Sequence, residues 1–127
     1  MDILLDTHAA IWFFADDKRL SKPAIAAIFD MENMIYVSIA SLWELAIKLH
    51  TGKLEFAGGL DGFIDAIYAN DFFLLGVDPG HVRATMELPA IHRDPFDRML
   101  IAQAVVEDMA IVTADVSIMA YDVRFVW

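Results

Sequence analysis

Four acidic residues stand at positions from which carboxylates could act together: Asp6, Glu44, Asp97 and Asp115. Like charges at close range repel one another or take up protons unless a cation lies between them. Carboxylate oxygens prefer hard cations, so Mg²⁺ is the expected ion and Mn²⁺ is possible, while the absence of cysteine excludes thiolate sites. Such ions can hold a phosphodiester and activate a water for attack. The residue types therefore point to nuclease or phosphatase chemistry.

Each of these carboxylates also has an ordinary structural explanation. Asp6 could close a turn after an apolar strand at residues 3–5, and Asp115 could cap a helix over residues 116–120. Asp97 falls in the first turn of a helix, where a negative charge complements the helix dipole. All three are nevertheless expected to converge on the carboxyl edge of one sheet, where ligands bind in open α/β folds. This convergence favours a shared site.

The helix that carries Asp97 has clear start signals. Asp94 is a favoured N-cap, and the proline that follows suits the first position of a helix over residues 95–106. Helical spacing places Asp97 on the same face as Ile101 and Ala104, so its helical neighbours are apolar. A charge in such a place needs a partner, and a metal ion is one candidate.

Glu44 allows two interpretations that depend on where its helix begins. If Ser41 is the N-cap, Glu44 completes a capping box and is purely structural. If Ser38 is the N-cap, Glu44 lies in the second turn and needs another role, such as an ordinary surface ion pair with Lys48 four residues later.

The remaining pattern predicts an α/β fold of three layers, in which helices cover both faces of a central, mainly parallel sheet of about five strands. Thr7 is expected to cap the first helix, Ser21 the second, and Gly52 to end the third. The expected strands cover residues 3–5, 34–37, 72–75, 110–112 and 123–127, the last of them at an edge; the expected helices cover 9–14, 21–31, 39–51, 60–69, 79–88, 95–106 and 116–120.

Length and charge limit the function classes. The 127 residues suit a single domain, 1–127, and 58% of them are hydrophobic, although the longest apolar run, residues 9–15, is too short to cross a bilayer. This apolar excess is typical of a subunit interface or a bound partner. No signal peptide is recognisable, so we expect a cytoplasmic protein with no membrane partner. A net charge of −10 argues against broad electrostatic binding of nucleic acid.

Basic residues near the acids could still contact a phosphate backbone. Arg93, Arg98 and Lys48 are the candidates, and the alternative for each is pairing with a neighbouring acid. None of the four histidines has metal-ligand spacing to another, so each is interpreted as a surface or capping residue. His8 and His92 flank candidate acids and deserve more weight than the other two.

Several motifs together resemble those of PIN-domain ribonucleases of the VapC toxin type, and the match spans nearly the whole chain. The resemblance implies a metal-dependent endoribonuclease in which the four acids hold Mg²⁺ or Mn²⁺, while Thr7 and Thr113 orient the ligands. It also implies a small antitoxin partner that blocks the site, and a toxin homodimer. The motifs are Leu5-Asp6-Thr7-His8-Ala9, Val37-Ser38, Ser41-Leu42-Trp43-Glu44, Gly52-Lys53-Leu54, the stretch from His92 to Ala104, and Val112-Thr113-Ala114-Asp115.

Two alternatives to a ribonuclease stay open. An aspartate-nucleophile phosphatase would suit Asp6, but such enzymes want a second aspartate two residues later, where this chain has His8. A non-catalytic module that binds metal and a partner is the other alternative. If the chain is a ribonuclease, its negative charge predicts recognition of a particular structured RNA.

Overall fold

Five short parallel strands form the central sheet of the computed structural model, which describes all residues 1–127. The strand order is β3-β2-β1-β4-β5. The expectation of five mainly parallel strands with the last at an edge is confirmed, and every neighbouring pair is in fact parallel. The strands are β1 (Asp2–Leu5), β2 (Met34–Ser38), β3 (Phe73–Leu75), β4 (Ala110–Val112) and β5 (Phe125–Val126).

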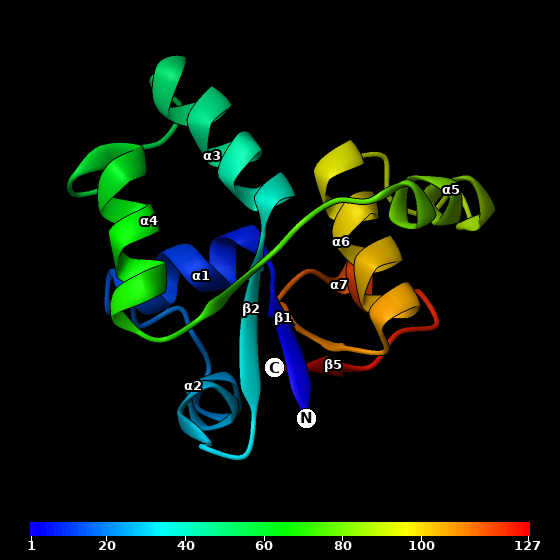
Figure 1. Cartoon of the computed structure of the whole chain (residues 1–127), viewed down its shortest axis with the longest axis horizontal. Helices are drawn as coiled ribbons and strands as arrows, with labels where there is room; N and C mark the ends of the chain where they lie inside the picture. The colour runs from blue at the N-terminus through cyan, green and yellow to red at the C-terminus, as the bar shows by residue number, and fades with distance from the viewer.

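Seven helices surround this sheet, and none of them is both long and apolar enough to cross a bilayer. In Figure 1, α1, α2 and α4 lie on one side of the strands, α6 and α7 lie on the other, and α5 packs outside α6. The helices are α1 (Thr7–Phe14), α2 (Lys22–Phe29), α3 (Ile39–His50), α4 (Gly59–Ala69), α5 (Pro79–Glu87), α6 (Pro95–Glu107) and α7 (Val116–Met119).

Two hydrophobic cores share the sheet, because successive strand residues point to opposite faces. Ile3 and Leu5 of β1 enter the core beneath α1, α2 and α4, whereas Leu4 enters the core beneath α6 and α7. Since helices cover both faces, β1 is apolar at three successive positions rather than at alternate ones. The three-layer α/β/α arrangement expected from the sequence is thereby confirmed.

Most helix boundaries follow the capping residues, with two corrections. Ser21 caps α2 as expected, but α2 ends at Phe29, because Asp30 turns to an extended conformation before the predicted end at residue 31. Thr7 does not cap α1. Asp6 does so instead, with extended backbone angles and a side chain that accepts a hydrogen bond from the amide of Ala9. Gly52, at φ 73°, follows the end of α3 as predicted.

The strand register brings three chain segments to one level at the carboxyl edge. Leu5 of β1 pairs with Val37 of β2 and with Val112 of β4. The next residues, Asp6, Ser38 and Thr113, therefore leave the sheet side by side, and Asp6 donates its backbone N–H to Val112 at 3.1 Å. In Figure 1, α3 and the first turns of α6 flank this edge.

Candidate metal centre

Asp6 is the innermost carboxylate of the carboxyl edge. It is only 5% exposed, and its Oδ1 accepts a hydrogen bond of 2.7 Å from the backbone N–H of Ala9. Burial raises the pKa of Asp6, although hydrogen bonds from Thr113 and Ala9 act in the opposite direction, and the charge of Asp115 adds to the rise. Asp6 therefore caps α1 and at the same time presents a buried carboxylate at the sheet edge.

Glu44 reaches the same edge because α3 begins at Ser38. The Ser38 hydroxyl accepts from the amide of Ala40, so Ser38 is the N-cap and the capping box with Ser41 is excluded. Glu44 then lies in the second turn and is 2% exposed. The interpretation of an ordinary surface ion pair with Lys48 is wrong in this respect: the pair exists, at 2.6 Å, but its acidic member is buried.

Both oxygens of Glu44 have defined partners. Thr7 donates its hydroxyl to Oε1 at 2.7 Å, and Lys48 Nζ contacts Oε2. Thr7 Oγ1 also lies 2.9 Å from the hydroxyl of Ser41. Because Asp6 caps α1, the Thr7 side chain is available to link the start of α1 to α3, and it fixes the orientation of Glu44.

Asp97 is the acid of this edge whose pKa is most clearly affected by its neighbours. Its pKa is raised to about 7, first by burial and then by the charges of Asp94 and Glu44, with a smaller contribution from Asp6. Asp94 is the N-cap of α6, as predicted, and its Oδ1 accepts from the amides of Phe96 and Asp97. A buried carboxyl group with other carboxylates beside it is one whose charged form a bound cation would stabilise.

Asp115 completes the group from the end of β4. It caps α7 by accepting from the amide of Ser117 at 2.8 Å, and its own N–H donates to Thr113 Oγ1 at 3.0 Å. Burial alone would raise its pKa, but hydrogen bonds from His92 and Ser117 hold the pKa below its ordinary value. Thr113 therefore supports two of the acids: it accepts from the backbone of Asp115, and it lowers the pKa of Asp6.

His92 lies between two of the predicted acids. Its Nε2 is 3.0 Å from Asp97 Oδ2 and 2.9 Å from Asp115 Oδ2. The sequence interpretation as a surface or capping residue is wrong, because the ring is half-buried among the carboxylates. Its place just before the N-cap of the acid-bearing helix was the only available signal, since the contact with Asp115 spans 23 positions. His8, in contrast, is exposed and lies against Trp12.

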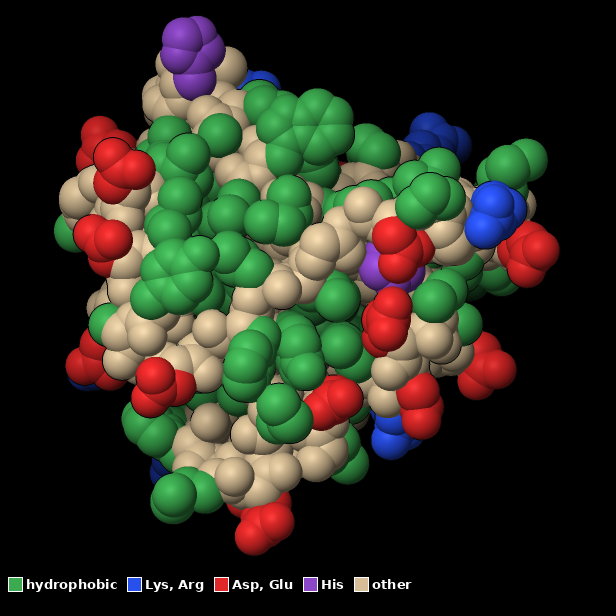
Figure 2. Space-filling model, in the orientation of Figure 1, with side chains coloured by type: hydrophobic (Ala, Val, Ile, Leu, Met, Phe, Trp, Pro, Cys, Tyr) green, Lys and Arg blue, Asp and Glu red, His purple; other side chains and the backbone are tan.

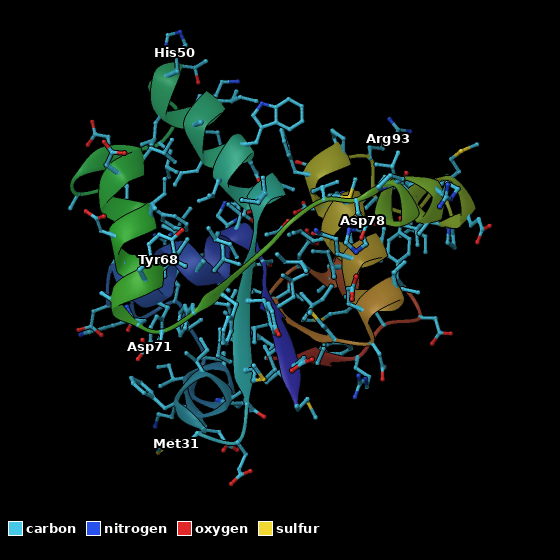
Figure 3. The ribbon with its side chains drawn as sticks, viewed as in Figure 1. Met31, His50, Tyr68, Asp71, Asp78 and Arg93 are labelled. Atoms are coloured by element: carbon cyan, nitrogen blue, oxygen red, sulfur yellow. The ribbon has the colours of Figure 1, made fainter.

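The three basic candidates have different surroundings. Lys48 is engaged with Glu44, and Arg93 is exposed without an ion-pair partner (Figure 3). Arg98 donates to the carbonyl oxygens of Pro89, Thr85 and Leu88, and to the hydroxyl of Tyr121, so its guanidinium holds the loop before α6. The structure thus gives Arg98 a structural task, while contacts of these residues with RNA stay a prediction.

A second histidine with two acids lies between α5 and α6. His81 is 1% exposed, and its ring Nε2 is 2.8 Å from Glu107 Oε1. Its backbone N–H donates to Asp78 Oδ1 at 3.1 Å. In both this group and the His92 group, three potential ligand atoms lie within 4.8 Å of one another. Both groups are thus compact enough to be considered as ion sites.

The carboxyl edge fits a hard divalent cation better. It combines four carboxylates and no sulfur ligand, and two of the acids, Asp6 and Glu44, are buried where uncompensated charge is costly. Burial raises the pKa of Asp97, and the charges of neighbouring carboxylates raise it further, so a cation placed among them would favour the charged form. This donor set suits Mg²⁺ or Mn²⁺.

The comparisons with known proteins agree with this geometry. The PIN domain model matches residues 3–123. The chain is 29% identical over 114 residues to "Ribonuclease VapC22" of Mycobacterium tuberculosis (strain ATCC 25618 / H37Rv), covering 89% of this chain and 86% of that protein.

Solved structures share the fold at low identity. VapBC2 from Rickettsia felis, solved with a DNA fragment from the promoter, has a TM-score of 0.72 at 14% identity and covers 98% of this chain and 97% of its own. FitAcB from Neisseria gonorrhoeae has a TM-score of 0.64 at 18% identity, covering 97% and 95%. VapBC-1 from nontypeable Haemophilus influenzae reaches 0.63 at 15% identity, covering 98% and 96%. The chain belongs to the PIN domain family and is a homologue of a VapC ribonuclease, with an acidic cluster compatible with a metal site.

Proposed function

We propose that the chain is a metal-dependent endoribonuclease that acts as the toxin of a toxin-antitoxin pair. The observation that carries the proposal is the gathering of Asp6, Glu44, Asp97 and Asp115 at one sheet edge, where burial, together with the charges of Asp94, Glu44 and Asp6, raises the pKa of Asp97 to about 7. The ribonuclease homologue supports RNA as the substrate class. A cytoplasmic location goes with such a substrate.

The chain's own residues would divide the work as follows. Asp6, Glu44, Asp97 and Asp115 would hold Mg²⁺ or Mn²⁺ directly or through water. When bound, such an ion activates a water for attack on the phosphodiester and stabilises the leaving oxygen. Thr7 orients the Glu44 carboxylate through the hydrogen bond from its hydroxyl, and Thr113 supports Asp115 by accepting from its backbone N–H. Arg93 offers an exposed positive charge for the RNA backbone.

Cleavage of a panel of tRNAs and ribosomal RNA fragments tests the proposal. The purified chain should cut with Mg²⁺ or Mn²⁺ and not with EDTA, and Asp97→Asn should lower the rate by at least about 100-fold, since direct ligands matter more than their supports. Asp61→Asn is the matched control, because Asp61 also lies in the first turn of a helix, α4, but is exposed and belongs to an element that carries none of the four acids. Asp61→Asn should cut like the wild type.

Three results would contradict the ribonuclease. EDTA-resistant cutting, or equal cutting by Asp97→Asn, would show that the acidic edge is not responsible. Hydrolysis of a small phosphate ester without cutting of RNA would favour the phosphatase. An inert protein that still binds cation and partner would be the non-catalytic module. Equal cutting of unrelated RNAs at low enzyme concentration would contradict the narrower proposal of one structured RNA target.

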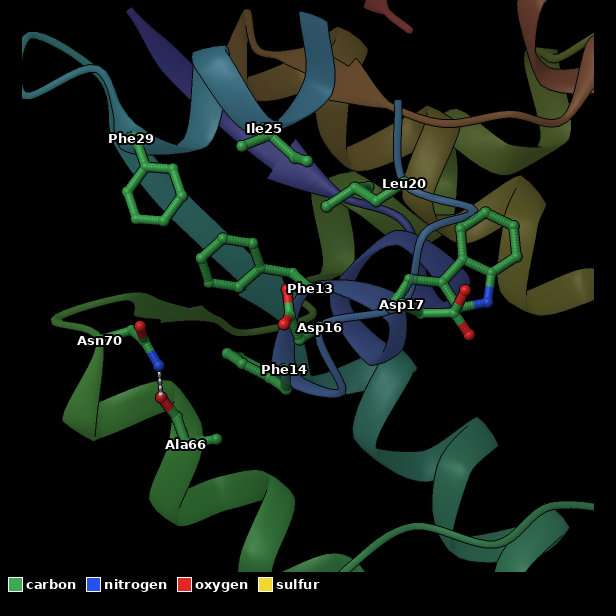
Figure 4. A pocket seen from close by; sticks show the side chains of 10 residues that line it. Phe13, Phe14, Asp16, Asp17, Leu20, Ile25, Phe29, Ala66 and Asn70 are labelled. Atoms are coloured by element: carbon green, nitrogen blue, oxygen red, sulfur yellow. Dashed lines mark hydrogen bonds between the residues drawn. The ribbon is translucent and has the colours of Figure 1, made fainter. Parts of the chain in front are cut away.

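Two apolar surfaces support the proposed partners. One lies over α1, α2 and α4, where a hollow of about 280 Å³ is lined by Phe13, Phe14, Ile25 and Phe29 (Figure 4); this surface suits an antitoxin. Figure 4 also shows that the Asn70 side chain donates a hydrogen bond to the carbonyl of Ala66, so the end of α4 that lines the hollow is hydrogen-bonded within its own helix. None of the four acids lines it.

The other apolar surface follows one side of α3. Ile39, Trp43 and Ile47 recur every four residues and are exposed, Trp43 at 65%, and the Trp43 ring meets Phe96 at 5.3 Å. Figure 2 shows apolar side chains gathered over α3 and toward α6. Exposed apolar patches of this kind mark protein interfaces, and we assign this one to a homodimer. Light scattering of the purified chain tests it: the mass of a single chain at all concentrations would contradict the dimer.

A further inference from the structure

The hydrogen-bond partners of His92 decide which ring nitrogen carries its proton. Nδ1 accepts a hydrogen bond of 3.1 Å from the backbone N–H of Asp94, so Nδ1 must offer its lone pair. In a neutral imidazole the other nitrogen then carries the hydrogen. Nε2 is therefore an N–H donor; it is hydrogen-bonded to Asp115 Oδ2 at 2.9 Å and lies 3.0 Å from Asp97 Oδ2.

The position of this ring is built into the loop that carries it. The hydroxyl of Tyr121 accepts from the backbone N–H groups of Ile91 and His92, at 3.2 and 2.8 Å, and donates to the carbonyl of Pro89. Arg98 binds the same hydroxyl and the same carbonyl. His92 is held against the carboxylates by contacts that involve neither acid.

A donor in this position excludes a cation from the same two oxygens. A divalent ion binds carboxylate oxygens at about 2.1 Å and is repelled by the positive end of an N–H dipole. His92 could become a ligand itself only by moving its proton to Nδ1, and that proton would then face the N–H of Asp94. Ligation by His92 would therefore break an existing hydrogen bond and create a repulsive contact.

We propose that His92 is a positioning residue that competes with the divalent cation for Asp97 and Asp115, so that its Nε2–H is displaced when the ion binds. The inference rests on the cation site of the proposed function. His92 holds the two acids, which come from α6 and from the end of β4, at one place in the fold. Removal of its imidazole frees both oxygens for the ion. His92 thereby lowers the affinity of the site for the cation.

Histidine ring NMR of the wild-type chain tests the displacement directly. The chain has four histidines, and the signals of their ring nitrogens report tautomer and hydrogen bonding. His81 is a matched internal control, because its Nδ1 also accepts a backbone N–H, from Asp78, and its Nε2 also faces an acid. Addition of Mg²⁺ should shift the His92 ring signals and leave those of His81 and His50 in place.

Cation affinity gives an independent measurement. Titration with Mg²⁺, followed by the backbone amide signal of Asp97, should give a dissociation constant about 3- to 10-fold lower for His92→Ala than for the wild type, as expected for loss of one competing charge-assisted hydrogen bond. His50→Ala, a substitution at an exposed histidine, should bind like the wild type.

The outcomes separate this inference from the ribonuclease proposal. An unmoved His92 ring at saturating Mg²⁺, weaker binding by His92→Ala, or no Mg²⁺-induced change at all would overturn the competition. Weaker binding would identify His92 as a ligand. A shifted His92 ring in a protein that cuts no RNA would support the competition while the proposed function fails.

Discussion

Two histidines of this chain use the same local device in different surroundings. His81 and His92 each accept a backbone N–H at Nδ1, from Asp78 and Asp94 respectively, at 3.1 Å in both cases. Each then directs Nε2 at a carboxylate between 2.8 and 3.0 Å away. By these distances alone the two rings are equivalent.

The surrounding charge distinguishes them. Near His81 the side chains of Asp78 and Glu107 are open to solvent, so water can compensate their charges. Near His92, a single donor faces Asp97 and Asp115, with buried Asp6 and Glu44 beside them, and the pKa of Asp97 rises to about 7. A surplus of buried acids over donors, rather than a histidine beside an acid, marks the functional site.

The largest difference between the two histidines should appear in stability. His81→Ala removes a ring that is 1% exposed, leaves the N–H of Asp78 without its partner and opens a cavity between α5 and α6. We expect a loss of about 2 to 4 kcal/mol in the free energy of unfolding, measured with urea, and an unchanged Mg²⁺ affinity. His50→Ala, at the exposed end of α3 (Figure 3), should change stability little. Weaker Mg²⁺ binding by His81→Ala would break the comparison.

The pH dependence of stability should come from the Asp97 side of the comparison. Because the pKa of Asp97 is raised in the folded chain, its charge opposes folding above about pH 7, and this penalty disappears as the pH falls toward the unfolded value of 3.8. When the pH is lowered from about 8 to about 5 in EDTA, the free energy of unfolding should rise by about 1 to 2 kcal/mol more for the wild type than for Asp97→Asn, after allowance for partial solvent screening. Unfolding curves at both pH values measure this gain, and equal gains in the two proteins would refute it.

The smallest expected effect concerns the loop that presents His92. Tyr121→Phe removes the hydroxyl that accepts from Ile91, His92 and Arg98. Loss of these bonds should cost about 1 kcal/mol of stability, since the donors are near the surface and water can replace part of the contact. The His92 ring signals should broaden while those of His81 stay sharp. Broadening of both rings would mean that the variant disturbs the whole of α6.

Local rules carried much of the fold. The N-caps at Ser21, Asp78 and Asp94 follow from residue type, and at Asp78 and Asp94 also from the proline next in sequence. Local rules failed where two residues could play the same part. Thr7 was expected to cap α1, but Asp6 does so, and the threonine hydroxyl instead donates to Glu44, 37 positions away in the sequence.

The amino-acid sequence by itself determined the alternation of strands and helices, and with it the expected convergence of Asp6, Asp97 and Asp115 on one edge, because the carboxyl ends of parallel strands lie at the same edge of a sheet. Tertiary structure alone decided that Glu44 is buried, that the Arg98 guanidinium is hydrogen-bonded to backbone carbonyls, and that His92 lies between Asp97 and Asp115. Burial, pKa and the exclusion of a cation by an N–H are properties of groups that lie far apart along the chain. They exist only once the fold has brought those groups within a few ångströms of one another.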